Sequence, residues 1–499
     1  MLENLALGFD VALSIKNLTF AFLGAFIGTA IGVLPGIGPT ATISLLLPLT
    51  FGVEPTTAII MLAGIYYGSQ YGGSTTAILL NLPGEVSGVV SAIEGYKMAQ
   101  NGRGGAALAI AAMGSFFAGT VATVVVAASG PLLTSVALSF GPADYFALML
   151  LGLIVACVLA QGSVVKAIAM VVLGVALGLV GTDVQTGQQR FTFGIPELSD
   201  GINFVALAIG LFGVAEIIIN LERPELRAGI VAKRGKLWLT REEWRYSIPA
   251  VLRGTALGTM LGILPGGGAA LSSFGSYMLE RRLTRQPERF GNGAIEGLAG
   301  PESANNAGAQ TAFIPLLTLG IPSNSVMALM VGALIIQGIQ PGPRMVEAQP
   351  ELFWGLIASM WIGNVMLLII NLPMIGMWVK LLQVPYRYLY LSILIFCSIG
   401  AYSINNNVFD IWIMGIFGCL GYIFAKVKME PAPLLLGFVL GPMMEEHLRR
   451  AMLLSRGDPT VFVERPISAT LLALALIALV LMLLPNMRRG KDTALAAGG

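Results

Sequence analysis

The stretch G-T-A-I-G-V-L-P-G-I-G at Gly28–Gly38 recurs almost unchanged as G-T-M-L-G-I-L-P-G-G-G at Gly258–Gly268. Each copy interrupts a long apolar run with one proline and several glycines. In lipid, the backbone groups freed by such a break need protein, water or a ligand as hydrogen-bonding partners. Hydrophobic segments interrupted at corresponding positions of two halves are typical of the binding site of a transporter. The pair therefore predicts two related halves with broken membrane helices.

The composition indicates a membrane protein. The 499 residues are 56% hydrophobic and only 11% charged, whereas soluble domains carry roughly 25% charged residues. Apolar stretches of about 20 residues, long enough for a membrane helix, recur along nearly the whole sequence. The charged residues gather in a few clusters, which excludes a large soluble core. The sequence predicts an all-α polytopic membrane protein with two inverted repeats, broken helices, re-entrant hairpins and about 10–12 transmembrane segments.

Many of the basic residues gather in three clusters: Arg223, Arg227, Lys233, Arg234, Lys236, Arg241 and Arg245; Arg281, Arg282, Arg285 and Arg289; Arg488, Arg489 and Lys491. The positive-inside rule places all three in the cytoplasm; nucleic-acid binding, the alternative for such clusters, is disfavoured in short loops between spans. We expect a first transmembrane repeat at 1–220, a cytoplasmic basic linker at 221–247, a second repeat with additional C-terminal spans at 248–485 and a cytoplasmic tail at 486–499. The charge pattern favours antiparallel halves, with a parallel duplication as the alternative.

The two broken helices predict a substrate site. A helix that restarts inside the membrane offers unpaired N–H groups and roughly half a positive charge, which favours an anion. The residues expected to bind substrate here are Pro35, Gly36, Gly38 and Thr40 after the first break, and Gly266, Gly267, Gly268 and Ser272 after the second. The alternative is that these glycines and prolines mark only a turn or tight helix packing.

A second pair of polar stretches, Tyr71–Gly84 and Pro301–Asn324, predicts further contacts. Each places hydroxyl and amide groups near the expected start of an apolar half-helix that ends at proline. Gly72, Gly73, Ser74 and Thr75 complete the expected substrate site, and the expected coupling-ion ligands are Ser74, Thr76, Asn81, Glu302, Asn305, Asn306, Gly320 and Ser323. Oxygen-rich side chains suit a hard cation such as Na+, and an acid at membrane depth suggests ion or proton binding. Helix capping and helix–helix contacts are the alternative roles.

Enzymatic chemistry finds little support. The only histidine is His447, and no nucleophile elbow, zinc-protease motif or P-loop is present in the sequence. We expect no enzyme, no cofactor and no metal other than a coupling Na+, with H+ as the alternative coupling ion. An anion channel or a membrane scaffold without ion coupling is the alternative function, because glycine-rich breaks also build filters.

The ordered motifs resemble one known family. They are G-V-L-P-G-I-G-P at Gly32–Pro39, Y-G-G-S at Tyr71–Ser74, N-L-P-G at Asn81–Gly84, E-G-Y-K-M-A-Q-N-G-R-G-G-A-A-L at Glu94–Leu108, P-E-S-A-N-N-A at Pro301–Ala307, I-P-L-L-T-L-G-I-P at Ile314–Pro322, Q-P-G-P at Gln340–Pro343, G-A-Y-S-I-N-N-N-V-F-D at Gly400–Asp410 and V-L-G-P-M-M-E at Val439–Glu445. In this set the chain resembles the large membrane subunit (TctA family) of the tripartite tricarboxylate transporters.

The resemblance implies a multi-pass carrier of the bacterial inner membrane. It implies secondary uptake of tri- or dicarboxylates, or related organic anions, coupled to Na+ or H+ rather than to ATP. The implied partners are a periplasmic substrate-binding protein and a small membrane subunit, with the lipid bilayer around them and no nucleic acid. Two positions depart from the family pattern: Ser323-Asn324 follows Gly320-Ile321-Pro322 where glycine is expected, and Glu94 stands where aspartate is expected.

Overall fold

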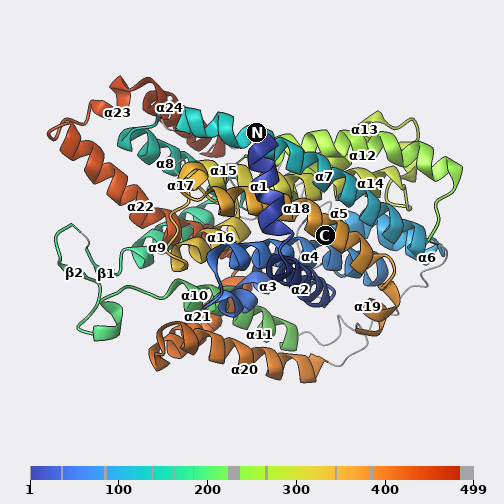
Figure 1. Cartoon of the computed structure of the whole chain (residues 1–499), viewed down its shortest axis with the longest axis horizontal. Helices are drawn as coiled ribbons and strands as arrows, with labels where there is room; N and C mark the ends of the chain where they lie inside the picture. The colour runs from blue at the N-terminus through green and yellow to red at the C-terminus, as the bar shows by residue number, and fades with distance from the viewer. Residues whose placement is uncertain are drawn as a thin grey trace.

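The structure is a computed structural model, and it describes residues 2–34, 37–83, 87–137, 139–160, 163–183, 185–222, 237–264, 268–342, 345–381 and 386–483. Within these ranges the chain is almost entirely helical, and the β1–β2 hairpin is the sole sheet (Figure 1). The predicted all-α class is confirmed.

The first half of the chain runs from α1 to α11. Its elements are α1 (Leu2–Ala12), α2 (Ile15–Gly32), α3 (Pro39–Leu46), the 3-10 turn η1 (Leu47–Thr50), α4 (Pro55–Leu80), α5 (Gly88–Ser91), the π-helix η2 (Ala92–Tyr96), α6 (Lys97–Gln100), α7 (Gly104–Ala137), α8 (Pro142–Leu159), α9 (Val164–Gly178), β1 (Gly181–Thr182), β2 (Gln189–Arg190), the 3-10 turn η3 (Pro196–Leu198), α10 (Phe204–Ala208), the π-helix η4 (Ile209–Val214) and α11 (Ala215–Glu222).

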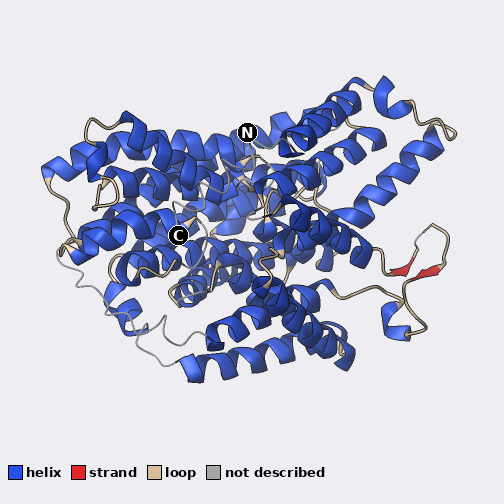
Figure 2. Ribbon diagram, turned by 180° about the vertical axis from the view of Figure 1, so that it is seen from behind, coloured by secondary structure: helices blue, strands red, loops and turns tan. Residues whose placement is uncertain are grey.

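The second half runs from α12 to α24. Its elements are α12 (Arg241–Gly262), α13 (Gly268–Leu283), the 3-10 turn η6 (Pro287–Arg289), α14 (Glu296–Thr311), α15 (Phe313–Leu319), α16 (Ser325–Ile336), α17 (Met345–Ala348), α18 (Pro350–Asn371), α19 (Ile375–Leu381), α20 (Tyr386–Asn405), α21 (Val408–Lys426), α22 (Ala432–Leu454), α23 (Val461–Glu464) and α24 (Pro466–Leu483). Helices α12, α13 and α14 lie together at one end of the molecule, while α8, α9 and α22 pack at the other (Figures 1 and 2).

Five described helical stretches are long and apolar enough to cross a membrane: Ile15–Gly32, Gly104–Gly130, Phe204–Glu222, Pro350–Asn371 and Val408–Lys426. Shorter apolar helices accompany them, among them those that follow the breaks. Large apolar side chains are exposed along the outer helices, as on Phe396 and Trp412, and lipid is the environment in which such exposure is stable. The protein is therefore a polytopic membrane protein, and the expected total of spans stays a prediction.

Helix pairs in the two halves pack through the same glycine spacing. In α2, a Cβ added at Gly28 would lie 2.4 Å from the Ile65 carbonyl oxygen of α4. In α12, a Cβ at Gly258 would lie 2.3 Å from the Ala304 carbonyl oxygen of α14. Only glycine permits backbones to approach so closely. Glycines four residues to either side make the same contact in both helices, at Gly24 and Gly32 and at Gly254 and Gly262.

Helix α4 and helix α15, which directly follows α14, also end alike. Helix α4 is terminated by Asn81 at φ 58°, and α15 by Gly320 at φ 73°. Both residues adopt the left-handed conformation that closes a helix, and both are followed by an apolar residue and a proline. The two halves therefore share the order of helix, break, helix and left-handed end.

Two expectations about these helices are wrong. Residues Gly72 to Thr76 do not begin a half-helix, because α4 continues without a break from Pro55 to Leu80 and uses Gly72 to pack against α2. Similarly, Asn305 and Asn306 lie inside α14, whose sixteen residues begin at Glu296. In α4, Gly72 therefore permits a close contact with α2 and does not mark the start of a helix.

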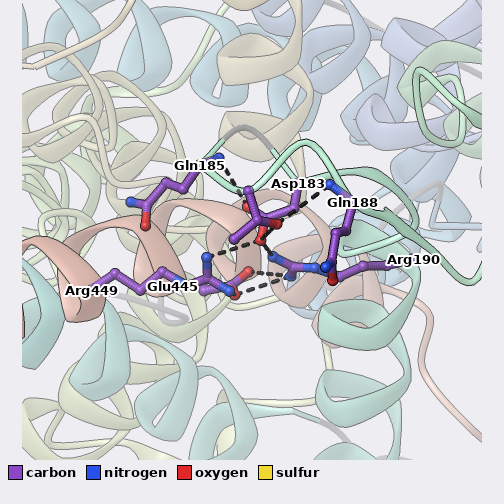
Figure 3. Close-up of polar contacts among 7 residues, drawn as sticks. Asp183, Gln185, Gln188, Arg190, Glu445 and Arg449 are labelled. Atoms are coloured by element: carbon purple, nitrogen blue, oxygen red, sulfur yellow. Dashed lines mark hydrogen bonds and ion pairs between the residues drawn. The ribbon is translucent and has the colours of Figure 1, made fainter.

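The β1–β2 hairpin projects from the helical body in both views (Figures 1 and 2) and is tied to α22 by a charged cluster (Figure 3). The Asp183 carboxylate contacts the guanidinium groups of Arg190 and Arg449, the latter at 2.9 Å. Arg190 donates to both oxygens of Glu445 at 3.0 and 2.9 Å. The hydrogen bond from Arg190, followed by that from the Gln185 amide, holds the pKa of Asp183 well below its usual value.

This cluster predicts an acid-dependent release of the hairpin. A carboxyl group with a lowered pKa in the folded state stabilises that state above its unfolded pKa, about 3.9, and the stabilisation disappears as the pH falls below it. Pepsin cleavage beside Phe191 in detergent-solubilised protein should therefore accelerate below about pH 4 relative to a free peptide of the same sequence. In the Asp183→Asn variant the faster cleavage should already be present at pH 5. Equal acid profiles for the two proteins would contradict this role.

Candidate functional site

The helices that restart after the two breaks open onto one shared cavity of about 620 Å³. Its wall includes the first residues of α3, from Gly38 to Ala41, and of α13, from Gly268 to Ala270. The start of α16, from Asn324 to Val326, completes this side. The helices that restart after the two breaks, one in each half of the chain, thus line one cavity.

Contacts across this cavity connect the halves crosswise. The hydroxyl oxygens of Thr40 in α3 and Ser325 in α16 lie 3.0 Å apart. Conversely, Ser273 in α13 donates a hydrogen bond of 2.9 Å to the carbonyl oxygen of Ser87. Each restarted helix therefore contacts the segment that follows the left-handed helix end of the other half.

The cavity offers hydrogen-bond donors without basic side chains. Helix α3 begins at the N-cap Gly38, which has no side chain to cap the first N–H groups. The Ser87 hydroxyl is buried at the wall and has no hydrogen-bond partner among the described residues. None of the described lining residues is Lys or Arg, whereas Glu216 and Glu430 are both part of the wall. An anion bound here would depend on helix ends and hydroxyl groups.

A second, much smaller cavity of about 20 Å³ lies beside Glu302 of α14. The Glu302 carboxylate, 1% exposed, accepts hydrogen bonds from Ser74 of α4 at 2.9 Å and from Ser91 of α5. Thr75, Ser115 and Asn371 also line this space. The structure therefore brings part of the predicted coupling-ion set, Ser74 and Glu302, into direct contact.

Other predicted residues have partners within the helices. Thr76 donates to the Val33 carbonyl oxygen at 2.7 Å, next to the first break, and Ser272 donates to the Gly268 carbonyl oxygen at 2.8 Å. Ser323 donates to the Ala312 carbonyl oxygen at 3.4 Å. Thr76 and Ser272 therefore form hydrogen bonds beside the two breaks, and Ser323 forms one at the junction of α14 and α15.

The asparagine pair divides between two environments. The Asn306 amide donates to Ser115 of α7 at 2.6 Å, beside the small cavity. The Asn305 side-chain oxygen is buried with no hydrogen-bond partner among the described residues. Asn81 and Gly320 are helix-ending residues, and neither they nor Gly72 and Gly73 line the large cavity in the described chain. The predicted residues Pro35, Gly36, Gly266 and Gly267 lie outside the described residues.

Glu94 has a positioning contact that the motif alone did not indicate. Its carboxylate is fully buried and accepts from the Tyr277 hydroxyl at 2.8 Å and from the backbone amides of Gly291, Gly293 and Ala294 at 2.5 to 2.9 Å. The carboxylate of one half thus orders the turn that leads into α14. Since α14 carries Glu302, this contact fixes the helix on which the small cavity is built.

Several lining residues were missed by sequence reasoning. They are Ser87, Asn324 and Ser325 at the large cavity and Ser115 and Asn371 at the small one. Ser115 and Asn371 lie in long, mostly apolar helices, α7 and α18, with no motif around them. Asn324 caps α16 by accepting from the Met327 amide at 2.9 Å.

Comparisons with known proteins agree with these motifs. A family model described as the tripartite tricarboxylate transporter TctA family matches residues 18–436. An uncharacterized 52.8 kDa protein in the TAR-I ttuC' 3' region of Agrobacterium vitis is 59% identical over 492 residues, covering 99% of this chain and 98% of that protein. An uncharacterized protein in the TAR-II ttuC' 3' region of the same organism is 63% identical over 235 residues, covering 47% of this chain and 97% of that protein. No solved structure matches the chain.

Proposed function

Because the chain belongs to the tripartite tricarboxylate transporter TctA family, we propose that it is the carrier subunit of a secondary active importer of tri- or dicarboxylates or related organic anions. The observation that carries this proposal is the shared cavity onto which α3 and α13 begin. Its volume of about 620 Å³ lies in the range of small-molecule sites, roughly 300–1,000 Å³. The family is one of transporters, not of enzymes.

The substrate carboxylates bind at the N-termini of α3 and α13. The first N–H groups of each helix have no partner in the helix itself and point along its positive end. Thr40 and Ser325 form one hydroxyl pair at this wall, and Ser87 adds a hydroxyl group that lacks another partner among the described residues. Two opposed helix ends suit a molecule with more than one carboxylate.

Transport is coupled to an inward cation gradient, Na+ or H+. The described cavity wall carries two acids and no basic residue, so a multiply charged anion needs accompanying cations. Each positive charge that enters down a potential of 100 mV contributes about 2.3 kcal/mol. Several coupled cations would therefore drive steep accumulation.

The two halves have inverted orientations in the membrane. This proposal is supported by the way in which the equivalent helices α4 and α14–α15 meet. Ser74 contacts Glu302 near one end of the pair, and the rings of Tyr67 and Phe313 lie 6.1 Å apart towards the other. Since the residue numbers fall along one helix as they rise along the other, the two helices run antiparallel. The carrier resides in the bacterial inner membrane, with a small membrane subunit and a periplasmic substrate-binding protein as partners.

Reconstitution into liposomes with these partners tests the coupling. A labelled carboxylate should accumulate against its gradient only when an inward Na+ or H+ gradient is imposed. An anion channel or an inert scaffold is the competing function, and flux that ignores every cation gradient would favour it. Accumulation without the two partner subunits would contradict only their assignment.

A matched pair of substitutions at Ala270 tests the substrate site. Ala270 lies in the first turn of α13 and lines the large cavity. The Ala270→Glu variant places a fixed carboxylate at the positive helix end, where it competes with the substrate. Uptake should fall by about tenfold relative to Ala270→Gln, which corresponds to about 1.4 kcal/mol of anion binding. Because the two side chains have nearly the same size, equal uptake by both variants would exclude an anion at this helix end.

A further inference from the structure

The small cavity beside Glu302 is separate from the large one. It lies between α4, α7, α14 and α18, and its described lining shares no residue with that of the large cavity. Its polar wall consists of Tyr71, Ser74, Thr75, Ser115, Glu302 and Asn371. Ser74, Thr75 and Glu302 belong to the predicted substrate and ion sites. Ser115 and Asn371 come from α7 and α18, where no sequence motif indicates a binding site.

Asn371 points to a ligand in this cavity. The residue is 5% exposed, and its side-chain oxygen has no hydrogen-bond partner among the described residues. Its orientation is determined by the amide nitrogen, which donates to the Leu367 carbonyl oxygen at 2.9 Å. Because the Leu367 carbonyl oxygen can only accept a hydrogen bond, the Asn371 amide nitrogen must face it, and the Asn371 side-chain oxygen faces the other way. A buried, unpartnered amide oxygen costs free energy unless a cation or a donor occupies the space before it.

The hydroxyl groups around the cavity also have oxygen lone pairs available. Ser74 donates its proton to Glu302, and Thr75 donates to the Tyr71 carbonyl oxygen at 3.3 Å. Ser115 accepts from Asn306 and retains a second lone pair. Hydroxyl oxygens with free lone pairs are suitable ligands for a hard cation.

The buried Glu302 carboxylate is the third feature of this cavity that calls for a cation. Its hydrogen bonds come only from neutral hydroxyl groups, and no Lys, Arg or His in the described part of the chain forms an ion pair with it. A fully buried, unpaired carboxylate is very costly. A cation in the adjacent cavity removes that cost.

We propose that this cavity binds one Na+ ion, ligated by Glu302, Ser74, Thr75, Ser115 and the Asn371 side-chain oxygen. The cavity, about 20 Å³, has room for one water-sized particle, for which about 10–15 Å³ suffices. That size excludes a hydrated ion and disfavours K+. The assignment rests on the proposed function insofar as this Na+ is the coupling ion, and it places that ion apart from the carboxylate.

Binding of 22Na+ to the purified protein, with K+ replacing Na+ at constant ionic strength as the reference, tests the proposal. The protein should bind Na+ saturably and melt at a higher temperature in Na+ than in K+. Asn371→Leu, which keeps the volume but removes the oxygen, should weaken Na+ binding by at least about tenfold, a loss of about 1.4 kcal/mol. Glu302→Gln provides a second variant of unchanged shape. The matched control is Ser359→Ala, also in α18, whose hydroxyl bonds within its own helix to the Leu356 carbonyl oxygen.

The outcomes separate this inference from the proposed function. No saturable Na+ binding, or Na+ binding that is unaffected in both Asn371→Leu and Glu302→Gln, would overturn the Na+ site, including the case of a protonated Glu302 beside a water molecule. Carboxylate uptake driven by H+ would then leave the importer intact. Conversely, Na+ binding that depends on Asn371 supports the site even if no carboxylate is transported, in which case only the proposed function fails.

Discussion

Replacing Gly72 by alanine should destabilise the protein strongly, whereas the same change at the adjacent Gly73 should not. A Cβ at Gly72 would lie 2.5 Å from the Thr29 carbonyl oxygen and 2.7 Å from the Val33 amide nitrogen, both of which are backbone atoms of α2. The helices would have to separate, at a cost of about 1–3 kcal/mol or more. A Cβ at Gly73 meets nothing within 4 Å, so alanine there should stabilise the helix by roughly 0.5–1 kcal/mol.

Thermal unfolding of the two variants in the same detergent measures this difference. We expect the melting temperature of Gly72→Ala to fall well below that of the unchanged protein, and that of Gly73→Ala to equal or exceed it. Similar melting temperatures for both would show that α2 and α4 are not in close contact. Uptake by Gly73→Ala adds a functional reading, because a normal melting temperature with reduced transport would support the predicted role of Gly73 in substrate binding.

Replacing Arg253 by methionine should have the second large effect. Arg253 in α12 donates to both carboxylate oxygens of Glu280 in α13, at 2.8 and 2.6 Å. Glu280 is 2% exposed, so the substitution leaves a buried carboxylate without its partner. Such losses cost about 3–5 kcal/mol in fully buried pairs, and we expect about 2–3 kcal/mol here because Arg253 is 39% exposed and partly screened.

A double-mutant cycle checks this pair. Adding Glu280→Gln to Arg253→Met removes the stranded charge and should restore most of the lost stability. If the double variant is instead as unstable as the sum of the single ones, the two side chains do not interact. The ion pair braces α12 against α13 on either side of the second break, so Arg253→Met should also impair transport by misdirecting the start of α13 at the large cavity.

The sequence allowed most apolar helices to be placed closely. The apolar runs of the sequence predict spans over residues 351–372 and 408–425, and α18 and α21 match these bounds within one residue at either end. Their boundaries are marked by local signals, a first-turn proline in α18 and the capping side chain of Asn407 in α21. By contrast, the sequence predicts no span over α22, because the charges of Glu445 to Arg450 resemble a solvated segment. In the structure these charges pair with the hairpin and with one another.

The site was predictable only where a motif marks it. The starts of α3 and α13, which follow the repeated proline–glycine breaks, line one cavity, and substrate binding there stays a prediction. The sequence pattern predicts a helix that begins at 305. In the structure α14 begins at Glu296, after a turn held by Glu94 from the other half of the chain. Ser115 and Asn371 reach the small cavity through tertiary packing of α7 and α18, and a single sequence carries no local record of such contacts.

The crosswise contacts of Thr40 with Ser325 and of Ser273 with Ser87 make the two halves depend on each other. Each repeat supplies part of the enclosure around the other's restarted helix, so one repeat expressed by itself has only half a binding chamber. An ion pair joins the segments on either side of the break in each half, Arg253 with Glu280 in the second and Lys16 with Glu54 at 2.7 Å in the first, so different residues play the same role in the two halves.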